Sequence, residues 1–229
     1  DAVPKTEAYS RYGNPSSYVV LGKRYQTLQT YQGYRERGIA SWYGTKFHGH
    51  RTSSGEPYDM YAMSAAHKSL PLPTYARVTN LDNGKSVIVK INDRGPFHEN
   101  RLIDLSYAAA TRLEILAKGT GLVEVEAIDP RNFGQLAEKP PIAASQPKVT
   151  KAPSLYLQLG AFADRSNAER LQARLSSSLP EPLHISETVS NQQAVYRVRI
   201  GPLASIESAD QLTKILAAEG IKSPRVVVD

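Results

Sequence analysis

Apolar residues at every second position predict β-strands in the first half of the chain. Val87, Val89 and Ile91 occupy alternate positions of the run 86–92. A period of two is typical of a strand that turns one face to a core. The same reasoning predicts further strands at 39–43, 75–80 and 122–128.

The stretch 91–106 places two acids at the ends of such strands. Asp93 directly follows an alternating run and precedes a Gly-Pro turn, which stops a strand because proline has no amide hydrogen. Asp104 lies inside a second apolar run. Ser106 after it is the expected N-cap of an alanine-rich helix over 107–116. Two acids joined by a turn predict the rim of a site.

The segment 154–229 contains an internal repeat. A shift of 41 residues aligns one strand, glycine turn and helix with another, so that Leu175 falls on Leu216. Each half gains one more strand, at 183–189 and 225–228. The order βαββαβ predicts an α+β domain, with a four-stranded antiparallel sheet and two helices on one face.

Alternation within this sheet separates a helix-facing side from an open side. The residues expected to face the helices are Leu157, Leu159, Val198 and Ile200. The residues expected on the open side are Tyr156, Gln158, Arg197 and Arg199. Amide, guanidinium and phenol groups suit a glycan or single-stranded RNA. An ordinary solvated face is the other interpretation.

Composition indicates two globular domains. With 229 residues, 41% hydrophobic and 22% charged, the chain is long enough for two. Residues 130–153 are rich in Pro, Ala, Lys and Gln without periodicity, which predicts a flexible linker. The expected order is a disordered lead at 1–17, an N-terminal arm at 18–34, a first domain at 35–129, the linker, and a second domain at 154–229.

Charge and cysteine content exclude several classes of protein. The formal net charge is +6, but the segment from Ser154 onward has eight basic and eight acidic residues, so the excess is spread over the rest of the chain. A diffuse excess does not predict nucleic-acid binding. Without cysteine there is no thiol nucleophile or thiolate zinc site. No apolar run could span a bilayer, and the start at Asp1 leads us to expect a processed or truncated chain.

Five ionisable residues fall in loops or at strand ends of the first domain: Glu56, Asp59, His67, Asp93 and Asp104. Paired carboxylates can protonate a glycosidic oxygen and stabilise the positive charge that develops on the sugar. Taken singly, an Asp or Glu of this kind is usually an ordinary solvated residue. His48 and His50 lack a third metal ligand, so we predict no metal site. Ser53 and Ser54 lack the context of a nucleophile.

An aromatic pair, Trp42 and Tyr43, ends the predicted strand 39–43. Such a pair suits stacking against the apolar face of a sugar, and an aromatic pair in the core is the alternative. The long polar segment 45–59 follows it. Loops of this length inside a compact domain tend to be functional.

Six short motifs of the first domain carry a family resemblance when they are taken together. They are Gly38–Gly44 (GIASWYG), Phe47–Gly49 (FHG), Thr52–Asp59 (TSSGEPYD), Ala65–His67 (AAH), Ile91–Phe97 (INDRGPF) and Ile103–Ser106 (IDLS). This pattern resembles the rare lipoprotein A family of bacterial septal lytic transglycosylases, over residues 18–129. The segment 154–229 resembles the SPOR domain of cell-division proteins, which binds glycan strands without peptide stems.

The resemblance implies a mainly-β, six-stranded double-psi β-barrel with short helices, the fold that expansins share. It implies an endolytic enzyme, without a cofactor, that cleaves the bond between N-acetylmuramic acid and N-acetylglucosamine in peptide-free glycan and leaves a 1,6-anhydro end. It also implies a periplasmic protein enriched at the septum, with possible division-site partners. The outer-membrane anchor would be a lipidated cysteine, which this chain lacks.

The resemblance also implies roles for individual residues. Glu56 and Asp93 would be the principal catalytic carboxylates, with His67 and Asp59 as partners that set protonation and orientation. Asp104 is a catalytic or binding candidate. Which carboxylate carries the proton depends on which one burial gives a raised pKa. The implied substrate contacts are Trp42, Tyr43, Asn92 and Arg94 in the barrel, and Gln158, Phe162, Arg197 and Arg199 in the SPOR domain.

Two other functions compete with the enzyme. The first is an expansin-like protein that binds and loosens glycan without cutting it. The second is a division-site adaptor in which the SPOR domain carries the whole function. Glu56 and His67 favour the enzyme, because they add acid–base groups to the two aspartates that expansins share.

Overall fold

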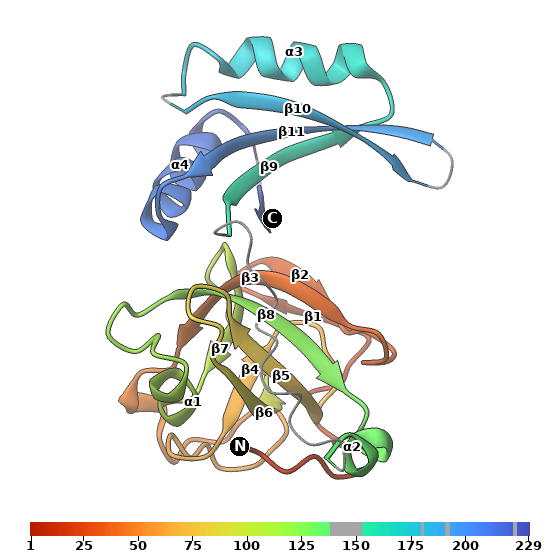
Figure 1. Ribbon diagram of the computed structural model, residues 1–229, viewed down its shortest axis with the longest axis vertical. Coiled ribbons are helices and arrows are strands. Elements are labelled where there is room, and N and C mark those ends of the chain that lie inside the picture. The colour runs from red at the N-terminus through yellow and green to blue at the C-terminus, as the bar shows by residue number, and fades with distance from the viewer. Residues whose placement is uncertain (138–152, 180, 191–192, 222–223) are drawn as a thin grey trace. The chain divides into compact units, whose positions relative to one another are not determined.

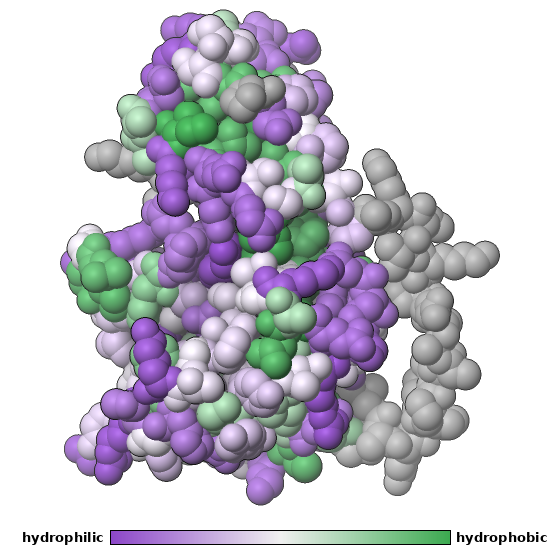
Figure 2. All heavy atoms as spheres, turned by 90° about the vertical axis from the view of Figure 1, so that its left-hand side faces the viewer, coloured by the Kyte–Doolittle hydropathy of each residue, from purple (hydrophilic) through white to green (hydrophobic). Residues whose placement is uncertain are grey.

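The computed structural model describes residues 1–137, 153–179, 181–190, 193–221 and 224–229. The chain divides into two compact units, 1–152 and 153–229, each built around its own sheet (Figure 1). Most of the surface visible in Figure 2 is hydrophilic, with small hydrophobic areas between the polar side chains. No helix of the described ranges is long and apolar enough to cross a membrane.

Six strands of the first unit close into a barrel in the order β3-β7-β4-β6-β5-β8 (Figure 1). Their bounds are β3 Arg35–Trp42, β4 Ser64–His67, β5 Thr74–Asn80, β6 Ser86–Asp93, β7 Arg101–Leu105 and β8 Gly121–Ile128. β3 pairs with β7 in parallel, as β4 does with β6, and the other neighbours pair antiparallel. The predicted six-stranded barrel is therefore confirmed.

The barrel interior is filled by the alternate positions that the sequence predicts. Val87, Val89 and Ile91 of β6 are at most 4% exposed. They join a cluster with Val78 of β5 and Val125 of β8, among others. Because every barrel strand is paired on both sides, the sheet has no free edge.

Short helices flank the barrel. Ser106 caps α1 (Tyr107–Arg112), and its hydroxyl accepts a hydrogen bond from Ala109 N at 3.2 Å, as predicted. The helix ends at Arg112, before the predicted residue 116. Glu114 has a φ of +59°, which a right-handed helix cannot contain. A single 3₁₀ turn, η1 (Thr45–Phe47), follows β3.

The prediction of a disordered lead at 1–17 is wrong, because the segment lies along the barrel. Ala2 N donates to Ile88 O at 2.9 Å, and Ser10 N donates to Leu72 O at 2.7 Å. Asn14 pairs with Leu72 through both its amide nitrogen and its amide oxygen. The segment is polar because its hydrogen-bonding groups, rather than apolar side chains, attach it to the barrel.

The arm at 18–34 packs on the first unit through its tyrosines. It contains the hairpin β1 (Ser17–Val20) and β2 (Lys23–Gln26). Tyr18 donates from its hydroxyl to Lys68 O at 2.6 Å. The rings of Tyr18 and Tyr25 both contact Phe97.

The expected linker at 130–153 is partly helical. Residues 130–137 form α2 (Pro130–Ala137), so the linker prediction is wrong for this part. Pro130 occupies the first helical position, where a proline costs no hydrogen bond. Residues 138–152 of the predicted linker lie outside the described residues.

The second unit is a four-stranded antiparallel sheet in the order β10-β11-β9-β12. Its elements are β9 Leu155–Phe162, α3 Arg165–Leu175, β10 Leu183–Ser190, β11 Gln193–Leu203, α4 Ile206–Ala218 and β12 Arg225–Val228. Leu157, Val198 and Ile200 are fully buried, and so are the repeat-related Leu175 and Leu216 of the two helices. The predicted βαββαβ fold is confirmed.

A bulge in β9 changes one side-chain prediction. Arg199 of β11 pairs with Gln158, but Val198 pairs with Gly160, so Leu159 is an extra residue on β9. Leu157 is fully buried, whereas Leu159 is only partly buried. The alternation that predicted Leu159 on the helix side stops at this bulge.

Candidate active site

Two carboxylates lie on one register line across the barrel strands. Asp104 of β7 pairs with Ser41 of β3 and with Ala66 of β4. Asp93 of β6 pairs with the other side of Ala66. Paired residues point to the same face of a sheet, so Asp93 and Asp104 flank Ala66 with backbones about 10 Å apart, twice the strand spacing. We call them the carboxylate pair.

Asp93 is held by donors from a loop and from its own strand end. Its Oδ1 accepts from Ser53 N at 2.8 Å, from Ser53 Oγ at 2.6 Å and from Arg94 N at 2.7 Å. Its Oδ2 accepts from the Tyr43 hydroxyl at 3.3 Å. Every one of these contacts uses the carboxylate as an acceptor, which fixes its orientation.

Asp104 is partly buried on β7. Burial raises the pKa of Asp104 above its ordinary value, while the Ser41 hydroxyl and the nearby Arg101 and Lys68 oppose the rise. The hydrogen bond from Ser41 Oγ to Asp104 Oδ1 is 2.5 Å long. A carboxyl with a raised pKa is suited to deliver a proton.

Two tyrosines lie against the carboxylate pair. The ring centres of Tyr43 and Tyr58 are 4.8 Å apart. Burial and the charges of Asp93 and Asp104 raise the pKa of Tyr43 well above its ordinary value. Burial, with smaller effects of the nearby carboxylates, raises the pKa of Tyr58 to about 12. Both phenols are therefore neutral at physiological pH.

A loop at 52–56 binds the end of β6 beside the pair. Ser54 N donates to Asn92 O at 3.2 Å. Glu56 accepts from Asn92 Nδ2 at 2.8 Å and from Lys90 Nζ at 2.9 Å. Partial burial raises the pKa of Glu56, but these two hydrogen bonds lower it more, so it lies below its ordinary value. Glu56 is therefore an ionised carboxylate.

A pocket of about 850 Å³ opens at Glu56. Its lining includes Asp59, Lys90, Asn92 and residues of the N-terminal segment. Asp59 is exposed, and its Oδ1 accepts from Tyr61 N at 2.9 Å. The structure thus groups Glu56, Asp59 and Asn92 around this pocket, and Asn92 directly precedes Asp93 on β6.

His67 lies apart from these carboxylates. It follows Ala66 on β4 and pairs with the core residue Ile103, so its ring points to the opposite side of the strand. Its Nδ1 accepts from the N–H groups of Ser69 and Leu70, at 3.2 and 3.0 Å. Burial, with the charges of Arg94 and Lys68, lowers the pKa of His67 to about 3. The ring is neutral.

With Nδ1 as an acceptor, the proton of this imidazole is on Nε2. Nε2 lies 2.9 Å from the Tyr34 hydroxyl, which in turn lies 3.0 Å from Glu36 Oε2. His67 therefore fixes the turn after β4 and joins it to Tyr34, in a structural rather than an acid–base arrangement.

Arg94 holds backbone rather than facing a pocket. It is 9% exposed. Its guanidinium donates to Gly13 O at 2.8 Å, His67 O at 3.1 Å, Leu70 O at 2.5 Å and Asn14 Oδ1 at 3.0 Å. Loss of the side chain would leave buried acceptors unpaired, at about 1–3 kcal/mol each. Arg94, which directly follows Asp93, thus binds the N-terminal segment to the end of β6 and to the turn after β4.

Trp42 lies at the barrel end in an aromatic row. Its ring centre is 6.0 Å from that of Tyr107, which is 6.1 Å from that of Tyr61. Trp42 is partly buried against the core, whereas Tyr61 is 67% exposed. One end of the row, Trp42, is thus packed against the core, and the other end, Tyr61, is open to solvent.

Two of the four predicted contacts of the SPOR domain fall in one cross-strand row. Gln158 of β9 pairs with Arg199 of β11 and with Arg225 of β12. Arg199 donates from Nη1 to Asp229 at 2.9 Å, and Arg197 lies two positions earlier on its strand. Phe162 is the last residue of β9.

Phe162 covers a glycine on the helix side. A Cβ at Gly160 would meet a Phe162 ring carbon at 2.8 Å and a Leu171 methyl carbon at 3.6 Å. Gly160 pairs with the buried Val198 and so shares the face that the helices cover. The structure therefore places Phe162 beside α3, apart from Gln158 and Arg199.

Sequence reasoning assigned no role to Ser41, Ser53, Tyr58 and Lys90. Ser41, Ser53 and Tyr58 fall within the family motifs, which was the available signal. Lys90 had none. In the part of the chain that the structure describes, no three His, Cys, Asp or Glu side chains form a metal-binding group. His48 Nδ1 accepts from Met60 N at 3.2 Å.

Comparisons with known proteins agree with this architecture. The family model described as "Lytic transglycolase" matches residues 35–126, and the SPOR domain model matches 151–227. The endolytic peptidoglycan transglycosylase RlpA of Pseudomonas aeruginosa (strain UCBPP-PA14) is 42% identical, over 99% of this chain and 80% of that protein. The protein of the same name from Vibrio cholerae is 40% identical, over 97% and 78%.

A solved structure covers the second unit alone. The crystal structure of the RlpA SPOR domain from Pseudomonas aeruginosa is 40% identical and covers 32% of this chain and 96% of that chain, with a TM-score of 0.31. Two family models match, and two relatives are at least 40% identical over nearly the whole chain. The chain therefore belongs to the RlpA family of endolytic peptidoglycan transglycosylases.

Proposed function

We propose that this chain is an endolytic lytic transglycosylase that cuts the bond between N-acetylmuramic acid and N-acetylglucosamine in peptidoglycan. The observation that carries the proposal is the carboxylate pair on one barrel face, in which burial raises the pKa of Asp104 and donors hold Asp93. Two carboxylates in different environments divide acid and charge-stabilising roles.

Asp104 supplies and recovers the proton. Its carboxyl donates to the glycosidic oxygen as the bond from that oxygen to the muramoyl C1 breaks, and the leaving sugar keeps this proton as a hydroxyl. The muramoyl 6-hydroxyl then attacks C1 and forms the 1,6-anhydro bond, and its proton returns to Asp104. No water is consumed, and atoms and charge balance.

Asp93 stabilises the positive charge that develops on the ring, with Ser53 and Tyr43 fixing its orientation. Glu56, ionised in the neighbouring pocket, adds negative charge to the substrate path, and Asp59 lines the same pocket. His67 and Arg94 act indirectly, since they hold the backbone on either side of the site. Trp42 and Tyr43 form its aromatic wall.

The finer parts of the proposal concern the form of the substrate and the location of the protein in the cell. We propose that the glycan lacks peptide stems, and that the SPOR domain directs the protein to such glycan at the division septum. We further propose a periplasmic protein anchored to the outer membrane through a lipidated cysteine outside this chain, with division-site partners.

Product analysis tests the reaction. Purified peptidoglycan, stripped of peptides by amidase, is incubated with the chain and analysed by mass spectrometry. We expect new 1,6-anhydro ends. Binding without anhydro products would refute the enzyme and favour an expansin-like protein.

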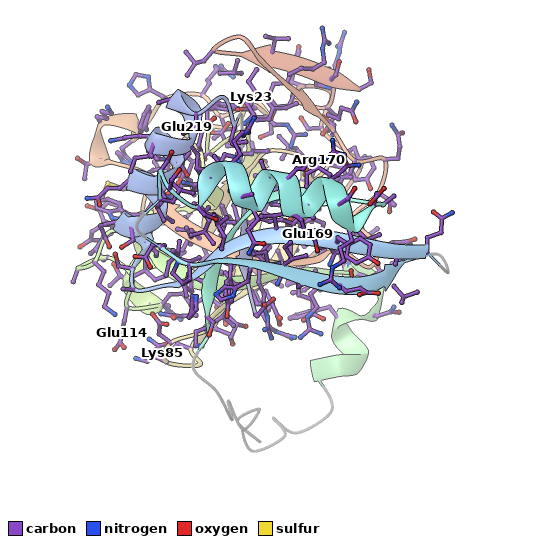
Figure 3. All side chains as sticks on the ribbon, turned by 90° about the horizontal axis from the view of Figure 1, so that it is seen from above. Lys23, Lys85, Glu114, Glu169, Arg170 and Glu219 are labelled. Carbon is purple, nitrogen blue, oxygen red and sulfur yellow. The ribbon has the colours of Figure 1, made fainter. Side chains whose placement is uncertain are left out.

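The SPOR surface has a separate test. We expect the double variant Gln158→Ala, Arg199→Ala to reduce pull-down on amidase-treated sacculi at least ~10-fold, because each residue contributes hydrogen bonds that a polar polymer needs. Arg170→Ala is the matched control, since Arg170 is exposed on α3 (Figure 3). The melting temperature should stay near that of the parent. Equal pull-down by both variants would place the glycan on another surface.

A further inference from the structure

The N-terminal segment forms one wall of the pocket that contains Glu56. Ala2 N bonds to Ile88 O, and Ile88 N donates to Asp1 Oδ1 at 3.0 Å, so the segment follows β6. The N-terminal residues that line the pocket are Asp1, Ala2, Val3, Lys5 and Glu7. The rest of the lining includes Glu56 and Asn92. The barrel alone therefore does not complete this pocket.

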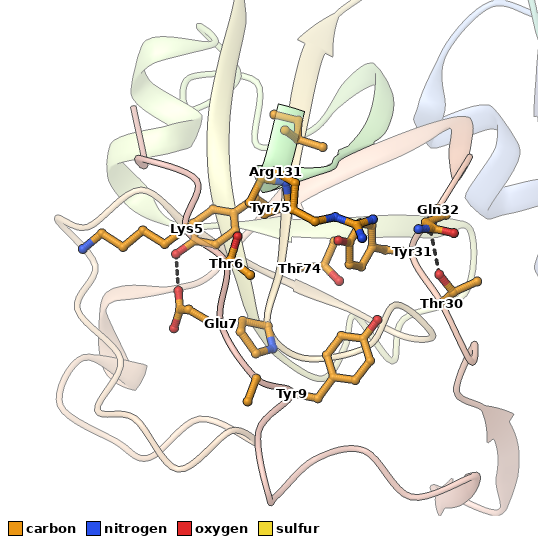
Figure 4. Close-up of a pocket in the computed structure, with 14 residues that line it drawn as sticks. Lys5, Thr6, Glu7, Tyr9, Thr30, Tyr31, Gln32, Thr74, Tyr75 and Arg131 are labelled. Carbon is orange, nitrogen blue, oxygen red and sulfur yellow. Dashed lines mark hydrogen bonds between the residues drawn. The ribbon is translucent and has the colours of Figure 1, made fainter. Parts of the chain in front are cut away.

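Lys90 lies between two carboxylates from different parts of the chain. Its Nζ donates to Glu56 Oε1 at 2.9 Å and to Glu7 Oε2 at 3.2 Å. Tyr75 donates from its hydroxyl to Glu7 Oε1 (Figure 4). Asn92 binds the remaining oxygen of Glu56. Both carboxylates are thus held by two donors, and Lys90 is the donor they share.

The cluster of Glu7, Lys90 and Glu56 carries two negative charges and one positive charge. Side chains of the three residues are 33%, 22% and 46% exposed, so solvent screens their charges only in part. Other ionisable groups that line the pocket are Asp1, Lys5, Asp59 and Tyr75. A Lys90 ammonium shared with Glu7 neutralises Glu56 only partly, and a net negative charge remains at the pocket.

We propose that Glu7 is a positioning residue for the active site. Because Glu7 accepts one hydrogen bond from the Lys90 ammonium, it keeps the Glu56 carboxylate oriented and leaves the negative charge of Glu56 available to substrate. This inference rests on the role of Glu56 in the proposed function. It gives the N-terminal segment a part in the chemistry, because Glu7 of this segment is the second carboxylate that binds Lys90.

Replacement of Glu7 by glutamine tests the charge without changing the shape. Glutamine can still accept from Tyr75, so the segment should stay in place. Among the described residues, Glu56 is then the carboxylate partner that Lys90 keeps. We expect kcat on peptide-free glycan to fall ~10-fold, because less negative charge faces the cationic transition state. The pKa of Glu56 should fall as well, since a like charge has been removed, and the acid limb of the rate profile should move to lower pH.

A second variant predicts the opposite shift. Lys90→Met removes the shared cation, so the pKa of Glu56 and the acid limb should rise. If Glu7 and Lys90 only stabilised the fold, neither variant would shift the acid limb. Glu114→Gln is the matched control, because Glu114 pairs with Lys85 on the exposed surface (Figure 3). Its kcat and pH profile should match those of the parent.

Carbon-13 NMR titration of the Glu56 carboxyl in the full chain gives a readout that does not need activity. An unchanged pKa of Glu56 in Glu7→Gln, together with parent kcat, would overturn the inference. Parent activity of Glu56→Gln would overturn it too, because Glu7 would have no functional group to position. A chain that makes no anhydro product but shows the two opposite pKa shifts would refute the proposed function and support the charge coupling.

Discussion

Asp104→Asn is expected to lower kcat about 1,000-fold, within the usual range for loss of a general acid. The substitution keeps the size of the side chain and can still accept from Ser41, but an amide does not deliver a proton. Substrate affinity should change little, because the proton moves only in the transition state. Release of anhydro products from amidase-treated glycan, followed by mass spectrometry, measures the effect.

The pH profile of the parent should also show that Asp104 acts as an acid. An acid must be protonated to act, so the rate should fall as pH rises through the pKa of Asp104, which burial raises above its ordinary value. Ser41→Ala is the control. The Ser41 hydrogen bond lowers this pKa, so its removal should move the alkaline limb to higher pH. A folded Asp104→Asn variant with more than a tenth of parent activity would assign the proton to another group.

Asp93→Asn is expected to lower turnover at least ~100-fold, because it removes the negative charge that stabilises the positively charged sugar ring. The carbonyl of asparagine can still accept from Ser53 and from Arg94 N, so the loop at 52–56 should stay docked. Stopped assays on peptide-free glycan give the rate, and thermal melting monitors the fold.

Tyr43→Phe separates the charge of Asp93 from its hydrogen bonds. This variant loses the 3.3 Å bond to Asp93 and keeps the carboxylate. We expect a smaller loss of turnover, less than ~10-fold. Near-parent turnover of Asp93→Asn would refute the role of Asp93, and an equal loss in both variants would show that orientation outweighs charge.

The N-terminal segment extends the site beyond the barrel motifs. Arg94 binds Gly13 and Asn14, and Ser10 Oγ donates to Ser54 O at 3.0 Å. These contacts reach the loop that holds Asp93, whereas Glu7 reaches Glu56 through Lys90. A segment without apolar periodicity therefore supports the surroundings of Asp93 and of Glu56.

Periodic patterns determined the secondary structure of this protein. Alternation at 86–92 predicted β6, the 41-residue repeat predicted the second unit, and Ser106 marked the start of α1. These patterns are local consequences of burying one face of an element, so the sequence alone contains them. The two aspartates near strand ends were also visible, because a Gly-Pro turn follows Asp93 and the helix N-cap Ser106 follows soon after Asp104.

Tertiary structure alone decided how the polar residues divide their work. His67, Arg94 and Asp104 all resemble site residues in the sequence, yet His67 and Arg94 are buried against backbone groups, and Asp104 is the one whose pKa burial raises. Register across β3, β7, β4 and β6 sets these environments. Burial and hydrogen-bond partners are properties of residues far apart in the chain, and no local pattern encodes them.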